Sequence, residues 1–218
     1  MADVVIRSRF NPNLQAAWFQ SVMEIINNIT ILAIILTGAA VIREREHGTI
    51  EHLLVMPLRP FDIMIAKIWA NGLVVVVAVI FSLYAVVQGL LDVPITGSIT
   101  LFIAGTIVFL FSVTSLGIFL ATIARSMPQF GLLAIPVFLV MMMLSGVYTP
   151  MDSMPAVLRY IMQFSPSTHF VSFAQAVLFR DAGIDVVWRD FAKVFFIGAM
   201  FFTAALYRFR KSITSAQS

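Results

Sequence analysis

Long runs of apolar residues, separated by short polar stretches, dominate the sequence. A helix that spans a membrane needs about 20 consecutive apolar residues. Five stretches reach that length, approximately Trp18–Ile42, Ile63–Leu91, Ile99–Ala124, Phe130–Tyr148 and Trp188–Tyr207. The pattern therefore predicts an all-α integral membrane protein with five transmembrane helices, forming one transmembrane domain over residues 18–207.

Residues 149–187 differ from these stretches, because their apolar pieces are short and are broken by Pro150, Pro155 and Pro166. Apolar runs of about 10–14 residues are more often re-entrant or interfacial than spanning. We predict an extracytoplasmic re-entrant helical hairpin, with a short helix after Pro155 and a second helix through Phe179. A pair of amphipathic helices lying on the membrane surface fits the pattern nearly as well.

The stretch "SPSTHF" is predicted to break the chain between these two hairpin helices. Non-helical backbone at membrane depth persists only where protein shields it or where it faces a wet cavity. We therefore expect the break to lie at the top of a cavity between two protomers. Its candidate residues are Ser165, Pro166, Thr168 and His169.

Composition supports a membrane protein and excludes several other classes. The chain has 218 residues, of which 60% are hydrophobic and only 11% are charged, whereas a soluble domain is about half apolar and a quarter charged. With no cysteines, disulfides and thiolate metal sites are excluded. No basic patch of the kind that binds nucleic acid is present.

The distribution of Lys and Arg near the span ends predicts the orientation. If the connector between the first two spans (residues 43–62) is cytosolic, eight basic residues lie inside and six outside. The inner set is Arg43, Arg45, Arg59, Lys67, Arg125, Arg208, Arg210 and Lys211, and the outer set is Arg7, Arg9, Arg159, Arg180, Arg189 and Lys193. The tail, residues 208–218, is then cytosolic.

This orientation places the N-terminal residues 1–17 outside, although no signal peptide or earlier span precedes them to carry them across. A short polar tail can cross unaided. The simpler expectation is that the chain lacks a first span and whatever followed it, so that residues 1–17 are the remnant of an extracytoplasmic segment.

The connector carries an unusual mixture of charges in "REREHGTIEHLLVMPLRPFD". If residues 44–56 form a helix, Ile50, Leu53 and Leu54 share one apolar face. We predict an amphipathic helix on the inner membrane surface, ended by Pro57 and Pro60, with Asp62 capping the next helix. A plain charged loop that fixes the topology is the alternative, but such a loop needs only a few Lys or Arg.

The first predicted span contains an acidic residue, Glu24, with Asn27 on the same face and Asn28 beside it. A charge inside the bilayer costs roughly 2.5–3.5 kcal/mol or more, so it marks a functional candidate. These three residues are candidates for lining a transport pathway. Glu24 is alternatively solvated near the outer headgroups, where the cost falls.

Three stretches of the sequence resemble one transporter family along essentially the whole chain. "REREHGTIEHLLVMPLRPFDIMIAKI" resembles the segment that follows the second span in permeases of the type-2 ABC exporter class. "RFNPNLQAAWF" is similar to the end of the extracytoplasmic domain before that span. "LSGVYTPMDSMPAVLRYIMQFSPSTHF" resembles the re-entrant helices before the last span. These permeases normally have six spans, with an extracytoplasmic domain between the first two.

The resemblance implies that the connector is a coupling helix that fits a groove on a separate ABC ATPase subunit. The residues to which this role carries over are Arg43, Glu44, Arg45, Glu46, His47, Gly48, Thr49, Glu51, Leu54, Pro57 and Arg59. The resemblance also implies an outer gate at the break of the hairpin, a second permease protomer (identical or different), and residence in the bacterial inner membrane.

The sequence has no G-x-x-x-x-G-K-[ST] loop, which cradles nucleotide phosphates. We therefore expect no cofactor on this chain, and expect ATP and Mg²⁺ on the partner ATPase. The leading hypothesis is the membrane half of an ATP-driven exporter. One alternative is an accessory subunit that binds the ATPase without transporting alone. An intramembrane enzyme ranks lower, because Glu24 is the only candidate catalytic group within a span.

Overall fold

A computed structural model of the chain describes residues 16–47, 59–93, 95, 97–148 and 153–216. Every regular element in these ranges is helical. The elements are α1 (Ala16–Glu46), α3 (Pro60–Phe81), the π-helix η1 (Ser82–Gln88), α4 (Ile99–Ile123), α5 (Met127–Leu144), α6 (Ala156–Met162), α7 (Pro166–Arg180) and α8 (Ile184–Ala216). Five helices are long and apolar enough to cross a membrane, as predicted.

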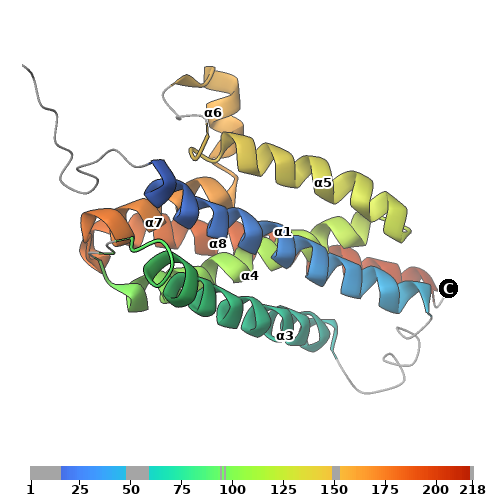
Figure 1. Ribbon diagram of the computed structural model, residues 1–218. Helices are drawn as coiled ribbons and strands as arrows, with labels where there is room; N and C mark the ends of the chain where they lie inside the picture. The colour runs from blue at the N-terminus through green and yellow to red at the C-terminus, as the bar shows by residue number, and fades with distance from the viewer. Residues whose placement is uncertain (1–15, 48–58, 94, 96, 149–152, 217–218) are drawn as a thin grey trace, which may run out of the picture.

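Helix α4 is the centre of the bundle, with α1, α3, α7 and α8 packed around it and α5 on the far side of α1 from α3 (Figure 1). In its most apolar stretch 67% of the residues are buried, against 17% to 22% in α3, α5 and α8. Those three helices therefore present most of their apolar surface to the surroundings, where a bilayer or another protomer can cover it.

The two ends of the bundle are distinguished by their contacts. At one end, which we call the connector end, the last turn of α1 contacts α3, the end of α4 and the start of α5. At the other, the hairpin end, Phe19 of α1 packs against Phe179 of α7 with ring centroids 6.0 Å apart. The backbone before α4 also meets α7 there, since a Cβ on Gly97 would lie 1.7 Å from the Val177 carbonyl oxygen.

The two predicted hairpin helices are present, since α6 and α7 are short helices between α5 and α8, and their extracytoplasmic, re-entrant placement stays a prediction. The position of the break is different. Pro166, Thr168 and His169 are helical, and only Gln163–Ser165 separate the two helices. Pro166 is the first residue of α7, a position that proline favours because its fixed φ suits the helix and its missing N–H has no partner there anyway.

The connector departs from its prediction at its first residues. Helix α1 continues without interruption through Glu46, so residues 44–46 form its last turn rather than the start of a separate helix. Pro60 is the first residue of α3, for the same reason as Pro166, whereas residues 48–56 of the predicted amphipathic helix lie outside the described residues. Asp62 does cap α3, since its Oδ2 accepts a hydrogen bond from the Arg59 backbone N–H at 3.2 Å.

Candidate functional site

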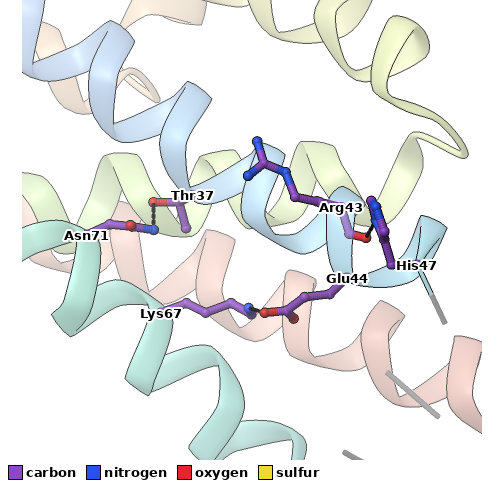
Figure 2. Close-up of polar contacts among 6 residues, drawn as sticks. All are labelled: Thr37, Arg43, Glu44, His47, Lys67 and Asn71. Atoms are coloured by element: carbon purple, nitrogen blue, oxygen red, sulfur yellow. Dashed lines mark hydrogen bonds and ion pairs between the residues drawn. The ribbon is translucent and has the colours of Figure 1, made fainter. Parts of the chain in front are cut away.

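The last turn of α1 carries a run of charged residues whose side chains point to different neighbours. Glu44 forms an ion pair with Lys67 of α3, and Figure 2 shows the two side chains meeting between the helices. The Lys67 side chain is only 13% exposed and that of Glu44 31%. Further into the bundle, one turn after Lys67 and two turns before Glu44, Asn71 of α3 donates a hydrogen bond to Thr37 of α1 at 3.2 Å. The Glu44–Lys67 ion pair thus joins α1 to α3 where both side chains are partly shielded from solvent.

The next two residues contact the turn between α4 and α5. Arg45 donates from Nη1 to the backbone carbonyl of Ala124 at 2.7 Å. Ala124 is the C-cap of α4, where helix carbonyls lack intrahelical partners and a cation is favoured. Glu46 accepts from the Met127 backbone N–H at 2.9 Å. Met127 is the first residue of α5, where an anion is favoured.

Glu44, Arg45 and Glu46 therefore contact three different helices, namely a side chain of α3, the end of α4 and the start of α5. We call these three residues the α1 clamp. Each contact matches the sign of charge that its partner favours. Because the partners belong to α3, α4 and α5, a displacement of the last turn of α1 acts on all three helices at once.

The remaining connector residues fall into two groups. Arg43 and His47 are exposed, and Nδ1 of His47 lies 2.8 Å from the Arg43 carbonyl oxygen (Figure 2). Arg59 is the N-cap of α3. Five predicted coupling residues lie outside the described residues, namely Gly48, Thr49, Glu51, Leu54 and Pro57.

Glu24 and its predicted neighbours meet at the hairpin end of α1. The Asn27 side chain donates to Glu24 Oε2 at 3.4 Å, and Asn28 donates to the Glu24 carbonyl at 2.9 Å. The structure adds Tyr148, which follows α5 and donates its hydroxyl to Glu24 Oε2 at 3.4 Å. Desolvation, and then the Glu24 charge, raise the pKa of Tyr148 above its ordinary value. Glu24 is itself exposed.

The hairpin residues lie at and after the start of α7. Ser165 is the N-cap of this helix and Thr168 is its third residue, and both are buried. His169 lies with Nε2 2.9 Å from the Gln163 carbonyl oxygen and Nδ1 3.7 Å from Oδ1 of Asp190 in α8. Ser172 also donates to Asp190, at 3.1 Å. The network ties α7 to α8, and the proposed gating role stays a prediction.

Sequence reasoning missed the partners of the α1 clamp. Lys67 could be recognised as an interfacial lysine, but nothing in the sequence pairs it with Glu44. Ala124 and Met127 contribute only backbone atoms, which no pattern of side chains reveals.

Comparison with known proteins decides the family. The sequence profile of the ABC-2 type transporter matches residues 3–179. The chain belongs to this family of membrane transport permeases. It is therefore a multi-pass membrane protein, consistent with its five apolar helices.

Curated relatives match nearly the whole chain. It is 61% identical over 213 residues to the inner membrane transport permease YhhJ of Escherichia coli, a match that covers 98% of this chain and 57% of the relative. It is 30% identical over 215 residues to the probable multidrug ABC transporter permease YbhR of the same organism, covering 97% of this chain and 57% of the relative. The chain thus spans a little over half the length of these relatives.

Proposed function

We propose that the chain is the permease subunit of an ATP-driven exporter of the inner membrane, and that it couples ATP hydrolysis by a separate ABC ATPase to export. The observation that carries the proposal is the α1 clamp. A partner that pushes on the connector displaces the end of α1, and the clamp transmits that displacement to α3, α4 and α5 through three charged contacts.

Two further features support this assignment. The connector end carries the charge bias expected of a cytosolic face, with Arg43, Arg45 and Arg59 directly at span ends. The relatives named above are a transport permease and a probable multidrug ABC transporter permease. The connector end is therefore taken as cytosolic, and the ATPase subunit with its ATP and Mg²⁺ is placed beneath it.

A second permease protomer is the expected partner within the membrane. Helices α3, α5 and α8 are mostly unburied in the single chain, and their exposed residues include Leu73, Leu132 and Phe196. A second copy or a related permease would cover part of this surface, and lipid would cover the rest. Glu24, Asn27 and Asn28 remain candidates for the pathway between protomers.

The experiment reconstitutes the permease with its cognate ABC ATPase in proteoliposomes and compares two kinds of variant. Glu51→Ala and Arg59→Ala change predicted docking residues and should weaken co-purification of the ATPase. Arg45→Gln changes the α1 clamp and should leave co-purification intact while abolishing the stimulation of ATP hydrolysis by substrate. Arg125→Gln is the matched control, because Arg125 is an exposed arginine at the same end of the bundle and is not one of the predicted coupling residues.

The results separate coupling from mere association. Loss of stimulation in Arg45→Gln with retained binding supports transmission through the clamp. Equal behaviour of Arg45→Gln and Arg125→Gln would refute it. Binding of the ATPase by the unaltered chain without any transport would favour the accessory subunit instead.

A further inference from the structure

The start of α7 is a helix N-terminus that no side chain of the described residues caps. Its first turn contains no acidic residue. Pro166, the first residue, has no N–H, and by helix geometry the N–H groups of Ser167 and Thr168 have no intrahelical acceptor. The positive end of the helix dipole is therefore neither capped nor neutralised.

Three hydroxyl groups surround this N-terminus without partners. Ser165, Ser167 and Thr168 are 8%, 3% and 7% exposed. Within the described part of the chain none of their side-chain oxygens has a hydrogen-bond partner. Buried polar groups are nearly always hydrogen-bonded, so an orphaned cluster calls for a missing acceptor. The cluster has donors to spare and lies at a positive dipole end, so the acceptor that fits best is an anion.

An apolar groove of about 320 Å³ begins at the same place. This is near the lower end of the range for small-molecule sites, roughly 300–1,000 Å³. Among the described residues, no charged side chain lines the groove. Its walls come from five helices (α4 to α8) and from the N-cap of α7, and include Leu116, Pro136, Met141, Ser165, Pro166 and Phe201. A flexible methionine on the wall suits variable apolar chains.

The contacts of α7 place its N-terminus deep in the bundle. Val177 lies beside Gly97 just before α4 begins, and Phe170 stacks on Phe109 with centroids 4.2 Å apart. Ser165 lines the groove with Leu116, which lies 17 residues into α4 counted from Ile99. At 1.5 Å per residue this is roughly 25 Å from the start of α4. Pro136 is at the middle of α5 (Met127–Leu144).

We propose that the N-terminus of α7 and this groove form a binding site for an anionic amphiphile that enters from the bilayer, and that such amphiphiles are the transported class. The anionic head accepts hydrogen bonds at the start of α7, and the acyl chain fills the groove. Half-helices whose N-termini point at anionic groups near the membrane midplane are a recurrent device of transporters. The binding site stands on geometry alone, whereas the transport of its ligand rests on the proposed function.

Photolabelling of the purified chain in nanodiscs of neutral phosphatidylcholine tests the site. The probe is an 18-carbon fatty acid with a diazirine in its chain, and its methyl ester is the uncharged control. The acid should label peptides containing Pro136, Met141 or Phe201 about 2- to 30-fold more than the ester, the range that a charge at a helix terminus provides. Equal labelling by both probes, or no labelling above background, would overturn the proposal.

Variants assign the effect to the start of α7. Ser165→Ala combined with Thr168→Val removes hydroxyls with little change in shape and should lower labelling by the acid but not by the ester. Ser165→Asp retains a favoured N-cap residue and fills the anion position, so the folded variant should label with the acid no better than with the ester. Thr203→Val, which removes an exposed hydroxyl of α8, is the control and should change labelling by neither probe. Unaltered labelling of Ser165→Asp by the acid would exclude a site at this N-terminus.

Labelling requires neither ATP nor the ATPase, so it is independent of the coupling test. Export of the unlabelled acid from proteoliposomes that contain the permease and its ATPase tests the substrate role. If the acid labels the groove but is not exported when ATP hydrolysis is coupled, the site is a lipid site and the substrate claim fails. If coupling itself fails while labelling persists, the proposed function fails and the binding site stands.

Discussion

The contact between Glu46 and the Met127 backbone N–H can be removed from either side, which makes it the sharpest test of the α1 clamp. Glu46→Ala removes the acceptor. Met127→Pro removes the donor, and proline is tolerated at the first position of a helix because its φ already suits it. The preceding residue, Ser126, has the extended backbone that a following proline requires (φ −145°, ψ 163°).

The expected magnitude follows from the exposure of the contact. A hydrogen bond to a charged group contributes about 1.5–3 kcal/mol where buried, but this 2.9 Å contact is exposed. A helix N-cap contributes typically about 1 kcal/mol. We therefore expect an interaction energy of about 1 kcal/mol, which corresponds to roughly 2–4 °C in Tm for a chain of this size.

The assay is a double-mutant cycle on thermal unfolding of the purified protein. If the two groups interact, Met127→Pro destabilises the unaltered chain by about 1 kcal/mol more than it destabilises Glu46→Ala. Met127→Val is the control, because it shortens the same partly buried side chain but keeps the N–H, so its cycle with Glu46→Ala should be additive. Additive effects of Met127→Pro and Glu46→Ala would refute the contact.

Three other outcomes follow from the structure. Glu44→Lys and Lys67→Glu should each lower the free energy of unfolding, and the double variant should recover about 1–2 kcal/mol of it, a value between those of exposed and buried ion pairs. No recovery would count against the ion pair. Gly117→Ala should lower the Tm because its Cβ would lie 2.8 Å from a backbone oxygen of α1, whereas Gly72→Ala has open space and should gain about 0.5–1 kcal/mol. Glu24→Gln should reduce transport without lowering membrane abundance, and unchanged transport would remove Glu24 from the pathway.

The sequence predicts the spanning helices well because the bilayer imposes a simple requirement. Each span must satisfy its own backbone hydrogen bonds and remain apolar over about 20 residues, and the five predicted stretches correspond to the five long helices. The predicted end of the first span, Ile42, was four residues short, since α1 runs through Glu46. The sequence pattern predicts that Glu44, Arg45 and Glu46 belong to a separate amphipathic helix. In the structure their contacts with α3, α4 and α5 stabilise them as the last turn of α1.

The depth and packing of α7 could not be predicted from local pattern. The pattern predicts that Pro60 of the connector and Pro166 of the hairpin interrupt helices, whereas each is the first residue of a helix. What holds α7 in the bundle is the stacking of Phe170 on Phe109, a residue of α4 far away in the chain. Similarly, Arg45 and Ala124 are 79 positions apart. Such contacts depend on the packing of whole helices, which no short stretch encodes.

The α1 clamp and the groove share one rigid element, α4. Arg45 contacts Ala124 at the end of this helix, and Leu116, eight residues earlier, lines the groove, a separation of about 12 Å along the helix axis. If the ATPase moves α4 through the clamp and thereby changes the affinity of the groove for an anionic amphiphile, thermodynamic linkage requires the reverse effect. Bound amphiphile must then change the affinity of the permease for its ATPase by the same factor. Both affinities are measurable on the same purified complex, and an affinity for the ATPase that bound amphiphile leaves unchanged would show that the clamp and the groove are not coupled.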